Sequence, residues 1–287
     1  MRVGINTWVW TSPLTDRNAP ELLTRIAGMG FDAVELPLEE PGQLSSDVLG
    51  PCLVAAGLAP YVVGAMAPGR DLVAADPEVI AGTQAYLMAC IDLAAAIGSP
   101  AVCGPFYAST GRVWRMTPQE RPNVYRQWRE HLRPVADYAG QRAVKLGIEP
   151  LNRYETSLVN TVDQALEGLD GLLGPAVGLA LDSYHLNIEE RSSAEAIRLA
   201  GEHLVHVQVC GNDRGAPGHD QTDWPEFIAA LRDVGYSGPL NIESFTAENA
   251  SIASAASIWR PLAATQDALA EDGLAFLREL TGDTTTN

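Results

Sequence analysis

The chain has 287 residues, of which 46% are hydrophobic, so it can bury a large core and does not have the composition of a disordered or fibrous protein. It carries 19 basic and 36 acidic residues, which give a formal net charge of −17. A surface of that sign repels nucleic acid and anionic membranes, so we expect neither as a partner.

Short β-rich runs alternate with longer segments of helical periodicity from one end of the chain to the other. The predicted strands are residues 2–6, 33–37, 59–64, 100–104, 145–149, 177–182, 204–209 and 239–243. The clearest helical segments are residues 19–30, 76–98, 117–143, 223–236 and 251–280. Strands joined by helices of ten or more residues pair in parallel, and eight such strands predict closure into a (β/α)8 TIM barrel.

No linker or internal repeat divides this pattern. We therefore predict a single α/β barrel domain over residues 1–280, followed by a frayed tail, TGDTTTN, at residues 281–287. The alternative fold is an open doubly wound sheet. It is disfavoured because the glycine-rich GxGxxG turn of dinucleotide-binding sheets does not follow the first strand.

The sequence also predicts where the protein is located. We expect no membrane segment, because no run of about 18 apolar residues stands out, and the start, MRVGINTWVW, lacks the charged region of a signal peptide. The four cysteines are far apart and form no CxxC pair, which is typical of free thiols in a reducing compartment. These features predict a cytoplasmic protein.

Four of the predicted strands carry an oxygen donor at or near their C-terminal ends. These donors are Glu149, Asp182, Gln208 and Glu243, on the fifth to eighth strands. In a closed parallel barrel these ends meet at one mouth, where three carboxylates repel each other unless a cation joins them. We therefore predict that the four residues bind one divalent metal ion. A set of oxygen donors favours Mn²⁺, Co²⁺ or Mg²⁺ over structural zinc.

Several longer motifs surround these donors. They are GIEPLNRYE (147–155), LDSYHLNIEE (181–190), HVQVCGNDR (206–214), Trp224 followed by LRDVGYSGPLNIESF (231–245), and IWRPLA (258–263). The chain thereby resembles the D-tagatose 3-epimerase / D-psicose (allulose) 3-epimerase group of the xylose-isomerase-like sugar epimerase and isomerase superfamily. The resemblance spans nearly the whole chain, and its motifs are specific in the second half and weak in the first.

The resemblance implies a metal-dependent ketose 3-epimerase that acts on a free sugar. In this chemistry C3 is deprotonated and reprotonated through a cis-enediolate. Glu149, Asp182 and Glu243 match metal ligands of the group, and Glu149 and Glu243 also match its pair of acid/base catalysts. The remaining ligand of the group is usually a histidine, where this chain has Gln208, as hydroxypyruvate-isomerase-like members of the superfamily do.

Further residues match or suggest contacts with a sugar. By the resemblance, Glu155, His185 and Arg214 hold the hydroxyls and the carbonyl end of the substrate. Trp8 and Trp114, after the first and fourth strands, are either ordinary core or an apolar wall against a sugar face. His206 is read as core or as support for the metal site, and Glu35 and Glu39 as a loop ion pair or helix cap.

Alternatives to the epimerase remain open. An enediolate formed instead between C1 and C2 by the same metal and bases gives aldose–ketose isomerisation, as in a hydroxypyruvate-like isomerase, if the proton returns to the neighbouring carbon. A non-catalytic sugar-binding or partner subunit would not need two bases. Schiff-base aldolase chemistry would need a lysine in the mouth, but the only lysine, Lys145, begins its strand and so lies toward the opposite end. The expected partners are a small sugar and further copies of the chain, as a dimer or tetramer.

Overall fold

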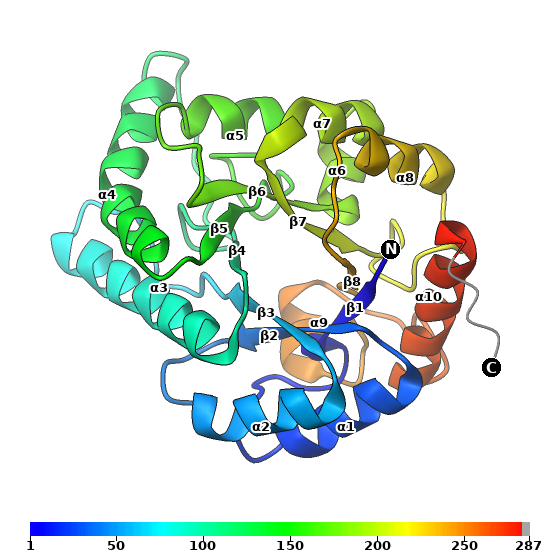
Figure 1. The fold of residues 1–287 in the computed structure, drawn as a ribbon. Helices are drawn as coiled ribbons and strands as arrows, with labels where there is room; N and C mark the ends of the chain where they lie inside the picture. The colour runs from blue at the N-terminus through cyan, green and yellow to red at the C-terminus, as the bar shows by residue number, and fades with distance from the viewer. Residues whose placement is uncertain (283–287) are drawn as a thin grey trace.

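The computed structural model describes residues 1–282 and closes eight parallel strands into one barrel inside a ring of helices (Figure 1). The strands are β1 Val3–Asn6, β2 Ala33–Leu38, β3 Ala59–Gly64, β4 Ala101–Gly104, β5 Lys145–Ile148, β6 Val177–Asp182, β7 Leu204–Val209 and β8 Leu240–Ile242. Each strand pairs with its neighbour in the sequence, and β1 pairs with β8 to close the sheet. The predicted (β/α)8 barrel and all eight predicted strands are confirmed.

Helices follow the strands and cover the outside of the barrel. They are α1 Ala19–Met29, α2 Ser46–Ala56, α3 Pro77–Ile97, α4 Arg121–Gln141, α5 Val162–Gly168, α6 Ser183–Glu189, α7 Ser193–Ala200, α8 Trp224–Asp233, α9 Ala250–Ala255 and α10 Gln266–Thr281, with short 3₁₀ turns η1 Thr7–Val9 and η2 Gly201–His203. Side-chain caps define several starts, as where Asp76 accepts the backbone N–H of Glu78 at the start of α3. Local capping chemistry therefore sets these helix boundaries.

The C-terminal helical region differs from its prediction. The expected helix over 251–280 is two helices, α9 and α10, with Pro261 between them. Proline lacks the N–H that a helix uses and so disfavours one continuous helix there, although α2 and α4 each accommodate one proline, Pro51 and Pro134. Thr281 is the last residue of α10 and Gly282 caps it with a left-handed φ of 75°, so these two residues of the expected tail belong to the helix end. Residues 283–287 lie outside the described residues.

The length and composition of helix α3 differ from the expectation that no segment is apolar enough to cross a membrane. By length and composition it is apolar enough to span one. In the structure it packs against β3, β4 and α4, and its residues Leu87, Cys90 and Ile91 are buried. Helix α3 therefore occupies the position of a core helix in the ring around the barrel.

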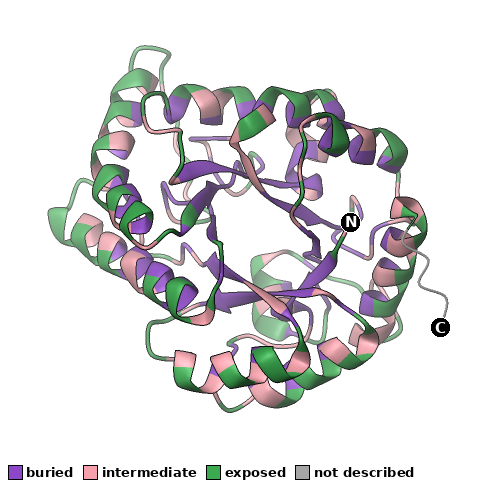
Figure 2. Cartoon of the chain, in the orientation of Figure 1, coloured by how far each residue is buried: buried purple, intermediate pink, exposed green. Residues whose placement is uncertain are grey.

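The inside of the barrel is filled by a cluster of mainly small side chains. Alternate residues of each strand point inward, and Ala33, Tyr61, Ala101, Cys103 and Ala180 form one cluster across the lower and central layers of this interior. The residues between them face the helices and join the main core, so the strands are buried on both sides (Figure 2). Above the central layer, polar side chains fill the barrel toward the C-terminal ends of the strands.

Gly147 of β5 is part of this close packing. A Cβ at Gly147 would lie 2.9 Å from Cys103 Sγ and 3.2 Å from Ala180 Cβ. We expect Gly147→Ala to lower the free energy of unfolding by about 1–3 kcal/mol, measured by urea unfolding, because the core must shift to accept the methyl group. The control is Gly140→Ala in α4, where the nearest atom lies at 3.5 Å. It should be neutral or stabilising by up to about 1 kcal/mol, and equal effects of the two changes would contradict the packing argument.

Candidate active site at the C-terminal mouth of the barrel

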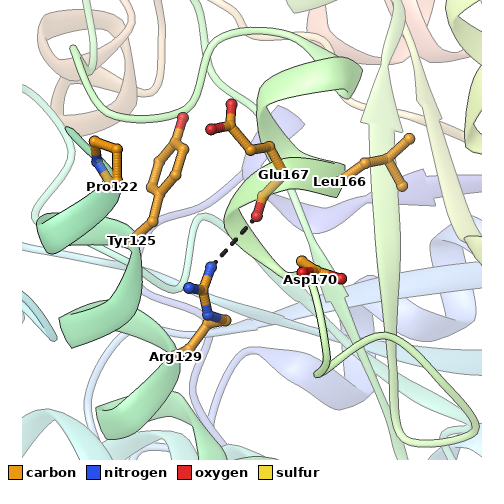
Figure 3. Close-up of a pocket in the computed structure, with 6 residues that line it drawn as sticks. All are labelled: Pro122, Tyr125, Arg129, Leu166, Glu167 and Asp170. Atoms are coloured by element: carbon orange, nitrogen blue, oxygen red, sulfur yellow. Dashed lines mark hydrogen bonds between the residues drawn. The ribbon is translucent and has the colours of Figure 1, made fainter. Parts of the chain in front are cut away.

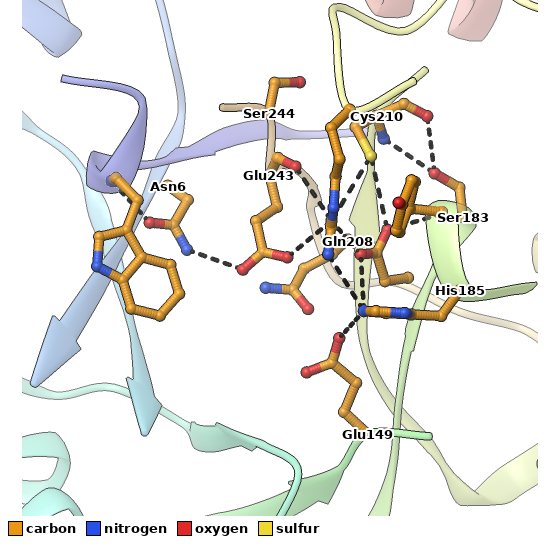
Figure 4. A network of polar contacts seen from close by, with 12 residues as sticks. Asn6, Glu149, Ser183, His185, Gln208, Cys210, Glu243 and Ser244 are labelled. Carbon is orange, nitrogen blue, oxygen red and sulfur yellow. Dashed lines mark hydrogen bonds and ion pairs between the residues drawn. The ribbon is translucent and has the colours of Figure 1, made fainter. Parts of the chain in front are cut away.

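Four side chains with oxygen donors lie where barrel strands end. Glu149 follows β5, Asp182 ends β6, Gln208 is the next-to-last residue of β7 and Glu243 follows β8. The register of the sheet places Asp182 beside Gln208, and none of the four residues is more than 6% exposed. Figure 4 shows Glu149, Gln208 and Glu243 converging on one space. The residues predicted as metal ligands are therefore gathered at one buried mouth.

Arg214 supplies a positive charge inside this cluster. Its Nη1 lies 2.5 Å from Asp182 Oδ2 and 3.1 Å from Glu243 Oε2. Its guanidinium carbon also lies 4.2 Å from the ring centre of Tyr184 and 4.8 Å from that of Phe245. The backbone of Arg214 has a left-handed φ of 68°, which directs the loop after β7 back over the mouth. A residue expected to hold a sugar thus also pairs with two of the carboxylates.

His185 is held in one orientation by a residue that the sequence reading missed. The backbone N–H of Asn152 donates to His185 Nδ1 at 3.0 Å, and Arg214 Nη2, which can only donate, lies 3.1 Å from Nε2, so both ring nitrogens face a donor. That Nε2 lies 3.5 Å from Glu149 Oε1 and 3.7 Å from Asp182 Oδ2. Burial and the nearby charge of Arg214 lower the pKa of His185 and so favour its neutral form.

Glu155 lies at the rim of the same group of residues. It is half-buried, and its Oε1 accepts a hydrogen bond from Asn152 Nδ2 at 2.7 Å. Asn152 therefore joins two residues that match sugar contacts: Glu155 in the loop after β5 and His185 in α6, which follows β6. Asn152 lies within the motif GIEPLNRYE, but the motif assigns it no role, because that role depends on a partner 33 residues away.

The environment favours the protonated forms of two glutamates. Burial raises the pKa of Glu149 well above its usual range, and the charges of Glu243 and Asp182 raise it further. Burial likewise raises the pKa of Glu243, against the opposing effect of Arg214. A bound divalent cation would lower both values. Two carboxyl groups whose protonation is set by such surroundings are suited to exchange protons with a substrate.

The donor atoms fit a metal ion. Glu149, Asp182 and His185 each offer one ligand atom, and these atoms lie within 4.8 Å of one another in a buried group. Gln208 Oε1 is buried and has no hydrogen-bond partner among the described residues. A buried amide oxygen without a partner is costly, and a cation would satisfy it. This part of the mouth can therefore hold a divalent metal ion.

Glu35 corrects an interpretation made from the sequence. It lies inside β2, is fully buried, and accepts hydrogen bonds from Asn6 Nδ2, Gln208 Nε2 and His206 Nε2, so it is neither a loop ion pair nor a cap. The alternation in AVELPL (33–38) places Glu35 on the face opposite Val34 and the other outward-facing apolar residues. That alternation is the signal that could have located it.

The two tryptophans lie in different surroundings. Trp8 is half-buried in η1, donates from Nε1 to Glu39 Oε1 at 2.9 Å, and contacts the ring of Phe245 edge-on at 6.4 Å. Since Phe245 also contacts Arg214, Trp8 flanks the cluster. Trp114 is half-buried in the loop after β4, under the guanidinium of Arg112 at 4.3 Å. A sugar contact by either tryptophan stays a prediction.

A second hollow lies on the outside of the ring, between α4 and α5 (Figure 3). It is lined by Pro122, Tyr125, Arg129, Leu166, Glu167 and Asp170. Arg129 Nη1 donates to the backbone oxygens of Glu167 and Gly168 at 3.3 and 2.9 Å, which links the two helices. This hollow holds none of the mouth residues, and its polar contacts serve the packing of α4 on α5.

Known proteins resemble the chain over nearly its whole length. A family model described as a xylose isomerase-like TIM barrel matches residues 23–280. A "Probable ketose 3-epimerase" of Synechocystis sp. is 32% identical over 279 residues, covering 97% of this chain and 96% of that protein. An "L-ribulose 3-epimerase" of Methylomonas sp. is 29% identical over 281 residues, covering 97% of both.

Solved structures agree with these sequence relatives. A D-allulose 3-epimerase from Methylomonas sp., crystallised in complex with D-allulose, has a TM-score of 0.88 at 28% identity and covers 97% of this chain and 96% of that one. A structure of L-ribulose 3-epimerase has a TM-score of 0.91 at 28% identity and covers 98% and 95%. The resemblance inferred from the sequence motifs is confirmed.

Proposed function

Because the chain belongs to the xylose isomerase-like TIM barrel family, we propose that it is a divalent-metal-dependent ketose 3-epimerase acting on a free sugar. The observation that carries this proposal is the pair Glu149 and Glu243. The two buried carboxyl groups reach the same cluster from β5 and β8, three strands apart in the barrel. A substrate between them can exchange a proton with either group, which is what inversion of a carbon centre requires.

Glu149, Asp182, Gln208 and Glu243 are the residues that would hold the metal. His185 is the less suitable ligand, because the Asn152 N–H occupies its Nδ1 and the Arg214 guanidinium lies 3.1 Å from its Nε2. When bound, a divalent cation would act as a Lewis acid on the carbonyl and neighbouring hydroxyl of the ketose. Mn²⁺, Co²⁺ and Mg²⁺ suit the oxygen donors.

The remaining steps belong to side chains of this chain. One glutamate removes the proton at C3 from one face of the sugar, and the other returns a proton on the opposite face. His185, Glu155 and Arg214 bind the hydroxyls and the carbonyl end of the sugar. Their burial around the mouth limits the access of water, which strengthens each of these polar contacts.

The product and its label test the proposal. D-Allulose and L-ribulose are the first substrates to try, because the relatives carry these sugars in their names. After incubation in D₂O we expect the C3 epimer, with deuterium at C3, by chromatography and NMR. An aldose product, with deuterium on the carbon next to the carbonyl at the chain end, would support isomerisation and contradict the epimerase.

Metal removal gives a second expected result. Purified protein should contain about one Mn²⁺, Co²⁺ or Mg²⁺ per chain, and dialysis against a chelator should abolish activity, since buried carboxylates need a counter-charge and the reaction a Lewis acid. Adding the metal back should restore activity, with metal content followed by mass spectrometry. Full activity in protein stripped of metal would contradict the proposal.

We also propose that the protein is a cytoplasmic homo-oligomer, a dimer or tetramer. Tyr154 and Trp259 are each 76% exposed, and large aromatic side chains are enriched at protein interfaces. Cys52, Cys90, Cys103 and Cys210 are all free thiols, as in proteins of a reducing compartment. Light scattering measures the molar mass in solution, and the mass of a monomer at micromolar concentration would contradict the proposed oligomer. A fluorescent fusion in the source cell tests the compartment.

A further inference from the structure

A fully buried carboxylate, Glu35, lies beside the mouth and shares the Asn6 amide with Glu243. Glu35 of β2 accepts three hydrogen bonds: Oε2 from Asn6 Nδ2 at 2.7 Å and from Gln208 Nε2 at 3.0 Å, and Oε1 from His206 Nε2 at 2.5 Å. These partners come from β1 and β7. Glu35 therefore ties three strands together immediately next to the candidate metal ligands.

The hydrogen bonds fix which end of each amide faces which way. Asn6 Oδ1 accepts the backbone N–H of Trp8 at 2.9 Å, so its NH₂ group must face Glu35 and, at 3.4 Å, Glu243 Oε1. With the NH₂ group of Gln208 bound to Glu35, Gln208 Oε1 points away from Glu35. In the view of Figure 4 the Gln208 amide lies between the carboxylates of Glu149 and Glu243.

The direction of the Gln208 amide decides what it can bind. Only the oxygen of an amide can coordinate a cation, because the nitrogen is a donor without a free electron pair. The two ends have nearly the same shape, so packing alone does not choose between them, whereas a carboxylate that accepts from the NH₂ group does. Gln208 Oε1, buried and without a partner in the described part of the chain, is the atom that this choice leaves for a ligand.

We propose that Glu35 is a positioning residue that turns the oxygen of Gln208 toward the carboxylate cluster and so completes the metal site. The inference rests on the proposed function, in which Gln208 is a metal ligand. Residues that orient a metal ligand typically contribute about 10–100-fold to metal affinity. Glu35 does this without touching the metal or the sugar.

The test is a double-mutant cycle read by Mn²⁺ affinity, measured by calorimetry or electron paramagnetic resonance. Glu35→Gln keeps the shape of the side chain but replaces one carboxylate oxygen by an NH₂ group. That NH₂ group would face a hydrogen-bond donor of Asn6, His206 or Gln208, so the Gln208 amide loses its fixed direction. We expect Mn²⁺ affinity to fall by about 10–100-fold. Glu190→Gln is the matched control: this half-buried carboxylate accepts the Val162 N–H at 2.8 Å outside the cluster, and its loss should leave Mn²⁺ affinity unchanged.

The second arm of the cycle separates orientation from charge. In a Gln208→Ala background, Glu35→Gln should cost little further affinity, because the amide that it orients is gone. An equal loss of Mn²⁺ affinity with and without Gln208 would overturn the inference, since Glu35 would then act only through its charge. The inference would also be overturned if Glu35→Gln left the Mn²⁺ affinity of the parent unchanged. If Gln208→Ala itself bound Mn²⁺ as tightly as the parent, the ligand assignment in the proposed function would fail, and the inference with it.

A conservative variant covers the case in which Glu35→Gln does not fold. Glu35→Asp keeps the negative charge and shortens the side chain by one methylene group, so the contact with Gln208 Nε2 is lost or stretched. It should lower Mn²⁺ affinity in the parent and not in the Gln208→Ala background. Circular dichroism of each variant confirms folding, and a loss of affinity that is the same in both backgrounds counts against the proposal here as well.

Discussion

Glu149→Gln and Glu243→Gln should each abolish net epimerisation. The epimerisation rate should fall by about 10²-fold or more, the usual contribution of general acid–base catalysis. Each mutant keeps one of the two bases. It should therefore still exchange the C3 proton for solvent deuterium, but with one epimer only, and the two mutants should choose different epimers. Proton NMR in D₂O with each pure epimer measures this exchange.

Two controls make this result decisive. Both glutamates are also proposed ligands, so the metal content of each mutant must be measured before its exchange is interpreted. Glu190→Gln, outside the mouth, should keep the parental rate. Exchange of the same epimer by both metal-loaded mutants, or transfer of the proton to a neighbouring carbon without inversion, would contradict the use of two faces and support an isomerase.

Arg214→Met should make the protein much less stable in the presence of a chelator. Arg214 is 5% exposed and pairs with Asp182 and Glu243, and removing one partner of a buried ion pair costs about 3–5 kcal/mol, because the other charges stay buried. For a chain of this size that corresponds to a fall in Tm of roughly 6–20 °C. Differential scanning calorimetry measures the change. Adding Mn²⁺ should recover part of it, since a cation would neutralise the same carboxylates.

Arg198 offers a matched control for this effect. It also pairs with two carboxylates, Glu226 at 2.8 Å and Asp233 at 2.9 Å, but its side chain is 37% exposed. Exposed pairs contribute about 0–1 kcal/mol, so Arg198→Met should change Tm by only a few degrees. Equal shifts for the two arginines would show that burial of the Arg214 cluster is not the cause.

The barrel could be predicted because each strand has a local signal. Buried parallel strands are short β-rich runs that end at turn residues, and the capped helices between them show their own periodicity. For the same reason Glu149, Asp182, Gln208 and Glu243 could be placed at one mouth: the topology brings strand ends together whatever the distance in sequence. The break between α9 and α10 was missed, and the shorter helices α2, α5, α6 and α7 were not singled out.

The contacts within the site depend on information that is not local. Glu35 was misread because a glutamate is usually exposed, and its burial depends on donors from β1 and β7. The place of Arg214 depends on a left-handed φ that a non-glycine residue rarely adopts. The orientation of His185 depends on one backbone N–H in the loop after β5 and on the guanidinium of Arg214. Each of these features requires a three-dimensional neighbour that no motif names.

The residues of the mouth stand on two kinds of backbone, the strands of the barrel and the loops that follow them. The proposed ligands and bases stand on or directly after strands, whereas Glu155 and Arg214, which match sugar contacts, stand on the loops after β5 and β7. Strands held in a closed sheet tolerate little change, and barrel loops accept substitution and insertion readily. Selection can therefore alter which sugar fits by changing these loops while the proton-transfer apparatus stays intact. A catalyst built in this way can acquire new substrates without inventing new chemistry.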